Sequence, residues 1–227
     1  NVPFISGLTA TASLNMETKS YQEKAHAEIA NSAGSFGTRK HTLSFGTGLH
    51  NNFEFNVRIS QVASNGYIDR ASSNMFGYFF NANYVKKNTL IKFIAFGGKE
   101  KTYQAWYGLE DLDKLENDRT YNPAGLYFDV LGNEQFYDDE TDNYWQNHFQ
   151  LHWTEKWSDK WTSNVALHYT LGKGYYKQYK EDEEFLDYGL SDFAGNTITD
   201  LVRKRWLDND FFGATYSLNF KANKTDV

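Results

Sequence analysis

Side chains alternate between apolar and polar along most of this chain, and this period of two constrains the fold more than any other feature. From Trp161 to Leu171 the odd positions are mostly aromatic or aliphatic, whereas the even positions are polar or small. Successive side chains of a β-strand point to opposite faces of a sheet, so the pattern predicts strands with one apolar and one polar face. The same test predicts eight strands, in the segments 25–33, 38–49, 53–60, 76–84, 89–103, 145–157, 161–171 and 212–220.

The links between these strands are of two kinds that alternate along the chain. Short turns are expected at residues 50–52, 85–88, 157–160 and 223–226. Longer links lie at residues 34–37, 65–74, 104–143 and 173–208. Because consecutive antiparallel strands reverse direction, all short turns fall at one end of the sheet and all long links at the other. Long structureless loops argue against a compact soluble domain, whereas outer-membrane barrels combine short periplasmic turns with long external loops.

Aromatic residues are unusually common, which supports a membrane setting. The 227 residues include 16 Tyr, 18 Phe and 6 Trp, while Leu, Ile and Val are scarce. Tyr and Trp prefer the membrane interface, where the ring is partly apolar and its polar atom reaches water. We therefore expect a membrane-interface girdle beside the short turns, made of Phe53, Tyr84, Trp157, Trp161 and Phe220. The predicted fold class is all-β, an antiparallel up-and-down transmembrane β-barrel.

Two other all-β folds share this alternation. One is a soluble carbohydrate-binding sandwich or jelly roll, in which the polar face would be the solvent face. The other is a small, closed eight-stranded outer-membrane barrel with a structural or adhesive role, filled by its interior side chains. The apolar face favours a membrane over the sandwich, because it carries loosely matched rings instead of the closely packed aliphatic side chains of a soluble core.

Composition and motifs exclude several classes of protein. The formal net charge of −6 argues against nucleic-acid binding, which needs a basic excess. The absence of cysteine excludes disulfide scaffolds, cysteine zinc sites and thiol chemistry. Neither a nucleophile elbow, an HExxH motif nor a Walker loop occurs, so we expect no enzyme, no catalytic residue and no cofactor.

Seven segments of the chain resemble one family of bacterial receptors. They are residues 7–18, 27–41, 65–73, 98–106, 119–122, 136–144 and 205–210. The most distinctive are NGYIDRASS at residues 65–73 and ETDNY at residues 140–144. Together they make the chain similar to the TonB-dependent outer-membrane receptors of Bacteroidetes-type bacteria. Residues 10–13 read ATAS where the family pattern has a GAFG-like turn, which leaves the boundary of the plug domain open.

The resemblance implies a barrel of about 22 strands that is closed by an N-terminal plug domain. The chain would then be a fragment holding about eight strands of the larger plugged barrel. Residues 1–23 would be the end of the plug domain and a linker. Residues 24–227 would be the N-terminal part of the barrel, with long external loops 104–143 and 173–208. Unpaired edges cannot lie bare in lipid, so we expect the isolated fragment to be unstable.

The long link 104–143 is expected to bind ligand, because functional residues concentrate on loops that a rigid scaffold holds. Aromatic faces with a few donors can grip a metal chelate, a porphyrin or a sugar ring; the alternative is that these rings pack into a small apolar core. The candidate ligand-binding residues are Tyr103, Gln104, Trp106, Tyr107, Arg119, Tyr121, Tyr127 and Tyr137. In the link 173–208, the cluster 203–205 can attract an anionic chelate or lipopolysaccharide phosphate, or pair with carboxylates.

No metal site is expected. His148, His152 and His168 are predicted to line the lumen as wet polar side chains, with a transition-metal site as the alternative. The acidic run 138–142 has the carboxylate density of a calcium site but not the spacing of an EF-hand, so a solvated acidic loop is expected.

The resemblance implies an energised transport receptor in the bacterial outer membrane. Such a receptor would import a scarce nutrient, which we expect to be a ferric siderophore or haem-like chelate. Its partners would be outer-membrane lipid, the nutrient ligand and the TonB energising complex, reached through an N-terminal part of the parent protein. The alternative within the family is an oligosaccharide importer that works with a surface lipoprotein.

Overall fold

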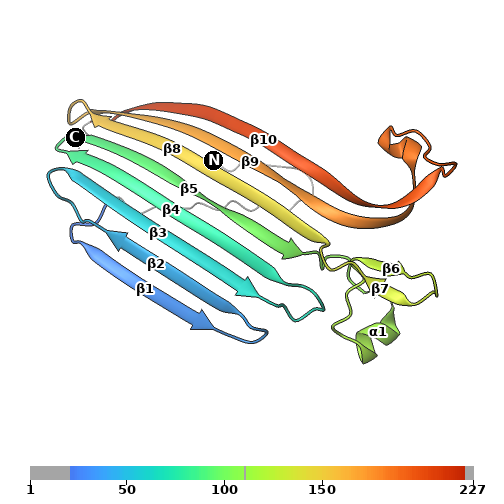
Figure 1. The fold of residues 1–227 in the computed structure, drawn as a ribbon. Coiled ribbons are helices and arrows are strands. Elements are labelled where there is room, and N and C mark those ends of the chain that lie inside the picture. The colour runs from blue at the N-terminus through green and yellow to red at the C-terminus, as the bar shows by residue number, and fades with distance from the viewer. Residues whose placement is uncertain (1–20, 110, 223–227) are drawn as a thin grey trace, which may run out of the picture.

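The computed structural model describes residues 21–109 and 111–222, and strands make up most of them (Figure 1). The eight long strands are β1 (His26–Ala33), β2 (Arg39–Gly46), β3 (Phe53–Ser64), β4 (Ser73–Lys86), β5 (Thr89–Tyr103), β8 (Thr141–Lys156), β9 (Trp161–Glu184) and β10 (Ile198–Phe220). The remaining elements are α1 (Leu112–Asn117), β6 (Leu126–Phe128), β7 (Glu134–Phe136) and the 3₁₀ turn η1 (Phe185–Tyr188). Among the described residues, no helix has the length and apolar character needed to cross a bilayer.

All eight long strands form one antiparallel sheet whose neighbours follow chain order, β1-β2-β3-β4-β5-β8-β9-β10. This up-and-down sheet confirms the predicted fold class, a partial β-barrel. The two edges of the sheet are β1 and β10, so these strands do not close on themselves, and the alternative of a closed eight-stranded barrel is wrong. The second sheet of the described residues is only the β6–β7 hairpin, so the sandwich alternative is wrong as well.

Strand register sorts the side chains onto two faces of the sheet. Phe53 lies opposite Tyr84, which lies opposite Ile91, and this row continues with aromatic and aliphatic residues across β8, β9 and β10. The neighbouring row of side chains points to the opposite face of the sheet and contains Glu54 and Asn83. The alternation in the sequence therefore produces one apolar face and one polar face, as predicted.

The apolar face of the sheet is not covered by other described parts of the chain. Within residues 21–109 and 111–222, the buried hydrophobic side chains are Ile94, Ala95, Tyr103 and Ala124. Large apolar side chains along the sheet stay exposed, among them Phe55 at 41% and Leu167 at 45%. A contiguous apolar surface of this extent needs an apolar environment, because monomeric soluble proteins rarely expose one.

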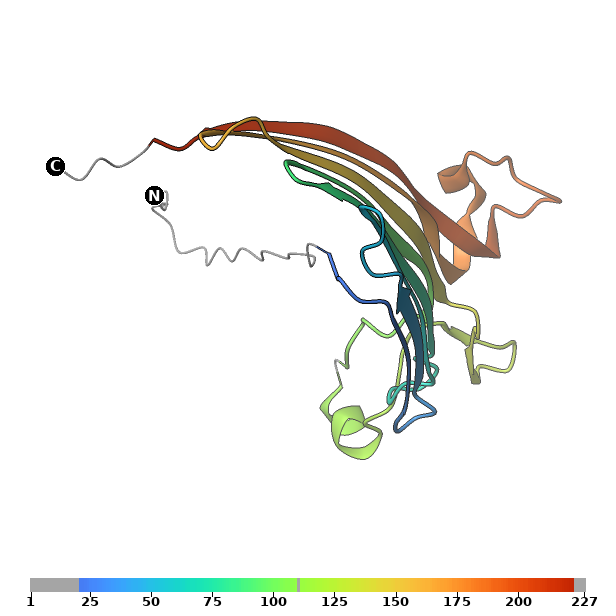
Figure 2. The ribbon, with the colours of Figure 1, turned by 90° about the vertical axis from the view of Figure 1, so that its left-hand side faces the viewer.

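The sheet is strongly curved (Figure 2). Its polar face, which contains Glu54, is the concave one. The start of the described chain runs on the concave side, where the backbone N–H of Gln22 donates to Glu54 at 2.7 Å. Glu54 is fully buried and also accepts from the Asn83 amide at 2.5 Å. The convex face is therefore apolar, as lipid contact requires. Residues 1–20, the main part of the expected plug end and linker 1–23, lie outside the described residues.

The expected loop 173–208 is much shorter than predicted, because the strands on either side continue through most of it. Strand β9 runs to Glu184 and β10 begins at Ile198, so the link between them is residues 185–197. The alternation persists along this extension, but its apolar positions are taken by lysine and tyrosine, as at Lys173 and Tyr175. The charged residues that predict a loop in the sequence instead continue both strands beyond the apolar band.

Where the loop 104–143 is expected, β5 ends at Tyr103 and β8 begins at Thr141, so the link between these strands is residues 104–140. It is not structureless, because it holds the helix α1 and the hairpin β6–β7. In Figure 2, α1 lies toward the concave side of the sheet and the hairpin toward the convex side. The link therefore straddles the rim of the sheet at the end where the long connections gather.

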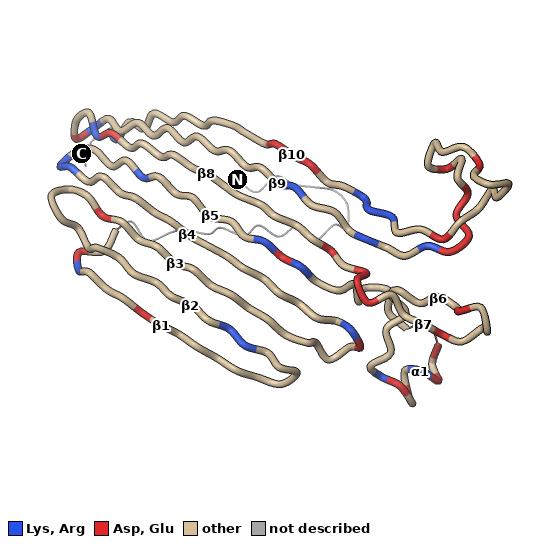
Figure 3. The backbone as a smooth tube through the Cα atoms, viewed as in Figure 1, with Lys and Arg blue, Asp and Glu red and all other residues tan. Residues whose placement is uncertain are grey.

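Charged residues gather toward the two ends of the sheet (Figure 3). Lys and Arg side chains are frequent near the loop end of β5, β9 and β10, and near the short turns, while the strand middles are mostly uncharged. This distribution matches an apolar band between two wet ends.

Candidate functional site

Tyr103, at the end of β5, fixes the base of the long link. Its side chain is 6% exposed, and its hydroxyl lies 3.0 Å from the Ala124 carbonyl oxygen and 2.6 Å from that of Tyr137. The same oxygen accepts from Arg70 Nε at 3.3 Å. One phenol therefore joins β5 to both arms of the link.

Arg70 completes this junction from the β3–β4 connection. Its guanidinium lies over the Phe136 ring at 3.8 Å from the centroid and donates to the carbonyl oxygen of Asn122. Arg70 adopts φ 60°, a left-handed conformation that costs free energy in a non-glycine residue and persists where surrounding contacts fix it. The preceding turn needs Gly66, at φ 78°, because a Cβ there would meet the Ala71 carbonyl oxygen at 2.3 Å.

Asn122 and Gln104 add two buried amides, each 1% exposed. The Asn122 amide nitrogen donates to the carbonyl oxygens of Asp69 at 3.0 Å and Gln104 at 2.9 Å, and its oxygen accepts from the Ala124 N–H. Gln104 in turn donates to the Lys177 carbonyl on β9. We call Arg70, Tyr103, Gln104 and Asn122 the loop clamp. Buried polar groups with all these partners favour one loop geometry, because a lost partner leaves a desolvated group unpaired.

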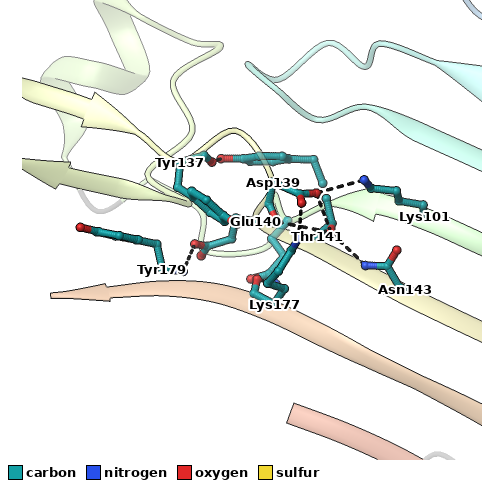
Figure 4. A network of polar contacts seen from close by, with 10 residues as sticks. Lys101, Tyr137, Asp139, Glu140, Thr141, Asn143, Lys177 and Tyr179 are labelled. Carbon is teal, nitrogen blue, oxygen red and sulfur yellow. Dashed lines mark hydrogen bonds and ion pairs between the residues drawn. The ribbon is translucent and has the colours of Figure 1, made fainter. Parts of the chain in front are cut away.

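An ion-pair network joins the end of the link to β5 and β9 (Figure 4). Asp139 lies 3.0 Å from the Lys101 ammonium and also contacts Lys177, whose side chain is only 12% exposed. Burial acts to raise the pKa of Asp139, but the hydrogen bonds and charges of the two lysines outweigh it and lower the pKa below its ordinary value. Asp139 is therefore a carboxylate at neutral pH.

Glu140, the next residue, has a different environment. Its side chain is 3% exposed, and it accepts from the Tyr179 backbone N–H at 3.1 Å. Burial raises the pKa of Glu140 above its ordinary value, and backbone hydrogen bonds from Tyr179 and Gly125 only partly offset this. The pKa values of these two adjacent carboxyl groups are therefore shifted in opposite directions.

A pocket of about 440 Å³ opens between the link and β9. Three tyrosine rings line it, those of Tyr107, Tyr121 and Tyr179. Lys114, Lys180, Asp111 and Glu140 also line it, which balances two cationic side chains against two carboxyl groups. Concave sites with aromatic walls and a few polar groups are typical of small-molecule binding.

Seven of the eight predicted binding residues fall into three groups, and Arg119 stands apart. Tyr107 and Tyr121 line the pocket, and exposed Trp106 packs against Tyr107 at 6.3 Å between ring centroids. The rings of Tyr127 and Tyr137 both pack on Tyr179, at 4.8 and 5.7 Å. Tyr103 and Gln104 are buried in the loop clamp, and Arg119 is exposed outside the pocket lining.

Several residues of the site were not selected from the sequence. Arg70 and Asn122 lie in segments that resemble the receptor family, but they gave no sign that they would support the loop. Lys114 comes from α1, whereas Tyr179 and Lys180 come from the extension of β9 and line the pocket because β9 is longer than predicted. The aromatic content of residues 173–208 was the available signal for Tyr179.

The predicted girdle residues lie at the short-turn end of the sheet. Phe53 packs on Tyr84 at 5.0 Å between ring centroids, and Trp161 packs on Phe220 at 4.7 Å. Trp157 is 63% exposed, and its indole N–H donates to Ser163 at 2.9 Å. These rings lie beside the short turns, and their role at a membrane interface stays a prediction.

The three predicted lumen histidines do not converge. His148 is held by Thr170 at 2.8 Å and stacks on Phe96, His152 contacts Gln150, and His168 packs on Phe211. Across the part of the chain that the structure describes, no group of three His, Asp or Glu side chains has an arrangement that could hold a metal ion.

Comparison with known proteins gives a likeness in fold. No protein-family model and no curated protein sequence matches the chain. Two solved structures of the ferric-catecholate import receptor Fiu from E. coli K12 match it, with TM-scores of 0.63 for the closed form and 0.61 for the open form. Sequence identity is 12% and 9%, and the match covers 94% and 92% of this chain. The chain spans about a third of the length of these receptors, at 31% and 33%.

Proposed function

We propose that this chain is part of a TonB-dependent receptor of the bacterial outer membrane that binds and imports a scarce nutrient. The observation that carries the proposal is the likeness of 94% of the chain to an import receptor, over a sheet whose convex face is apolar. The resemblance of segments such as 65–73 and 140–144 to the same receptor family supports it independently. In this proposal the chain has no enzymatic role.

The parent protein would continue the sheet at its two free edges. A single sheet with edges β1 and β10 exposes unpaired backbone groups, which cannot remain bare in a bilayer. Further strands would close the barrel, and residues 1–23 would lead from a plug domain into β1. The TonB complex would act on the N-terminal part of that parent.

The pocket beside the loop clamp is the proposed contribution of this chain to nutrient binding. It lies at the long-link end of the sheet, which corresponds to the external side of an outer-membrane barrel. Tyr107 and Tyr121 offer ring faces, and Lys114 and Lys180 offer positive charge to an anionic ligand. A ferric siderophore or haem-like chelate fits this chemistry, and the structurally similar Fiu imports ferric catecholates.

One observation favours a second cargo within the same family. The pocket also contains Asp111 and Glu140, so its charges balance, and three tyrosines remain as stacking surfaces. A neutral oligosaccharide, delivered by a surface lipoprotein, suits such a lining as well. The two cargoes differ in net charge, which makes them separable by experiment.

The test uses the intact receptor that contains this chain, purified in detergent, with a ferric catecholate and a neutral oligosaccharide as separate probes. Tyr107→Ala combined with Tyr121→Ala is expected to weaken binding of the true cargo roughly 30-fold, because each of the two stacking surfaces contributes of the order of 1 kcal/mol. Phe193→Ala, an exposed ring in the β9–β10 link, is the matched control. A receptor that binds neither probe, or a double variant with unchanged affinity for both, would overturn the proposal.

A further inference from the structure

The basic cluster 203–205 is divided between the two faces of the sheet. Register places Arg203 opposite Gln178 and Arg205 opposite Tyr176 on the concave face, whereas the lysine between the two arginines points to the convex face. Within residues 21–109 and 111–222, none of the three side chains forms an ion pair, so the alternative of pairing with carboxylates is not observed there. The two arginines instead donate hydrogen bonds to neutral side chains of β9.

Arg203 is connected to Tyr107 of the long link by two successive hydrogen bonds. A guanidinium nitrogen of Arg203 donates to the side-chain oxygen of Gln178 at 3.0 Å, and the Gln178 amide nitrogen donates to the Tyr107 hydroxyl oxygen at 2.9 Å. Gln178 is 8% exposed, so little water competes for these bonds. Tyr107 lines the pocket, which places one end of this series at the proposed nutrient site. We call Arg203, Gln178 and Tyr107 the donor relay.

The chemistry of arginine fixes the direction of the donor relay. A guanidinium group has only donors, so the Gln178 oxygen must face Arg203 and the amide nitrogen must face Tyr107. That nitrogen also has only donors, so the Tyr107 oxygen accepts from it. The hydroxyl hydrogen of Tyr107 is therefore directed away from Gln178, and it meets no acceptor in the part of the chain that the structure describes.

The positive charge at the far end of the relay strengthens this hydroxyl as a donor. The cation of Arg203 polarises the Gln178 amide, which polarises the Tyr107 hydroxyl, because hydrogen bonds in series reinforce one another away from water. An O–H group polarised in this way favours an anionic oxygen over a neutral one, since charge-assisted hydrogen bonds are about twice as strong as neutral ones.

We propose that the donor relay makes Tyr107 a hydrogen-bond donor to the nutrient, which presents an anionic oxygen of a carboxylate or catecholate at this wall of the pocket. Lys114 and Lys180 line the same pocket and complement such a group. Gln178 and Arg203 are then positioning residues that act on the nutrient through Tyr107. The inference rests on the proposed function, because it places the nutrient in the pocket, and it selects the anionic cargo over the neutral oligosaccharide.

A neighbouring contact on the same face provides an internal control. Tyr176 accepts from Arg205 at 2.9 Å, and its ring packs on Trp106 at 6.4 Å between ring centroids. Tyr176 is not one of the residues that line the pocket. Removal of its hydroxyl therefore takes the same atom from another ring in contact with an arginine, without a change in the pocket wall.

The test measures the affinity of the intact receptor in detergent for a ferric catecholate complex and for a neutral oligosaccharide. Tyr107→Phe keeps the ring and removes the donor, so the affinity for the ferric catecholate is expected to fall about tenfold. Tyr176→Phe is the matched control and is expected to bind like the wild type.

Gln178→Glu separates donation from structural support. The carboxylate has only acceptors, so it keeps its contacts with Arg203 and Tyr107 but draws the hydroxyl hydrogen toward itself. The affinity for the ferric catecholate is expected to fall as in Tyr107→Phe, whereas a merely structural role of Gln178 would be preserved. Arg205→Gln changes the net charge of this face by the same amount, and its expected smaller loss measures the effect of charge alone.

The outcomes distinguish failure of the donor relay from failure of the proposed function. Unchanged affinity in Tyr107→Phe or Gln178→Glu, or an equal loss in Tyr176→Phe, would overturn the relay and leave the proposed function in place. A wild-type receptor that binds only the oligosaccharide would overturn the anionic cargo, and one that binds neither probe would overturn the proposed function itself. Thermal unfolding in detergent shows whether each variant is folded. Tyr107→Phe, at an exposed ring, keeps the test decisive if Gln178→Glu does not fold.

Discussion

The two long links at the same end of the sheet, residues 104–140 and 185–197, are built in different ways. The first is anchored on the loop clamp, in which Gln104 and Asn122 are each 1% exposed. The second is a protruding tip, where Leu186 and Phe193 are each 73% exposed (Figure 2). Both links are rich in aromatic residues, but only the first has buried polar partners beneath its rings.

The difference teaches that length and aromatic content do not by themselves make a preorganised binding loop. Buried amides and an arginine that need their partners restrict the first link to one arrangement, which positions Tyr107 and Tyr121 beside the pocket. The tip of the second link has turns of its own, such as that between Phe193 and Asn196, but few contacts that would hold it against the sheet. The predictions below test this contrast.

Removal of Arg70 is expected to have the largest effect. Arg70→Ala takes a donor from the Asn122 carbonyl and a cation from the Phe136 ring, which together should lower the local stability of the link by ~3 kcal/mol. Amide hydrogen exchange in residues 104–140 should accelerate, while exchange in β2–β4 stays unchanged. Arg119→Ala, an exposed arginine of the same link, is the control. Equal protection in the two variants would show that the clamp does not order the link.

Loss of the Asp139 carboxylate should have the next largest effect. Asp139→Asn leaves the mostly buried Lys177 without a carboxylate, and a cost of ~2 kcal/mol is expected. Because the pKa of Asp139 is lowered in the folded protein, its stabilising effect is present above the unfolded value of 3.8 and is lost as pH falls through the folded value. Hydrogen exchange around residues 137–141 should report both changes.

The control for this variant is Asp159→Asn, whose side chain is 99% exposed in its pair with Lys156. Exposed pairs contribute little, so this change should be nearly silent. An effect of Asp139→Asn no greater than that of the control would show that the network in Figure 4 does not hold the end of the link.

The sequence predicts the sheet well because alternation is a local signal. All eight predicted strands are present, and neighbours in the antiparallel sheet follow chain order. The lengths of β9 and β10 were wrong because lysine and tyrosine take the apolar positions beyond the apolar band, as at Lys177. Charged residues at alternate positions are consistent with a strand in water and equally with a loop. The sequence therefore does not distinguish the two.

The site is only partly predictable because its support is not local. Aromatic residues gather in the link 104–143, and two of them, Tyr107 and Tyr121, line one pocket. The burial of Tyr103 depends on Arg70, 33 residues away, and Arg70 also contacts Asn122, 52 residues away. Such contacts follow from strand register and loop packing, which periodicity alone does not give.

Neutralising Glu140 should have a smaller effect of opposite sign. The pKa of Glu140 is raised in the folded protein, so the folded state binds its proton more tightly than the unfolded state. That contribution to stability is full below the unfolded value of 4.5 and is lost as pH rises through the folded value. Glu140→Gln should therefore stabilise the link at pH 7.5 by less than about 1 kcal/mol and make it less sensitive to pH.

The measurement for Glu140→Gln compares hydrogen exchange of residues 104–140 between pH 5 and 7.5, corrected for intrinsic exchange rates. Asp139 is ionised throughout this range, so its own titration does not interfere. Asp138→Asn, an exposed neighbour in the same acidic run, is the control. Destabilisation of the link by Glu140→Gln at pH 7.5 would show that the carboxylate is required there.

The smallest effect is expected at the protruding tip. Replacing Leu186, Leu190 and Phe193 by Ser removes three exposed side chains, and the stability of the sheet should change by less than about 0.5 kcal/mol. Exchange protection in residues 104–140 and affinity for the nutrient should both stay at the wild-type level, because the tip does not share the contacts of the loop clamp. The matched variant Tyr107→Ser, Tyr121→Ser should lose affinity at similar stability. If the tip variant lost nutrient affinity as strongly, the two links would act together, and ligand binding would not depend on the clamped link alone.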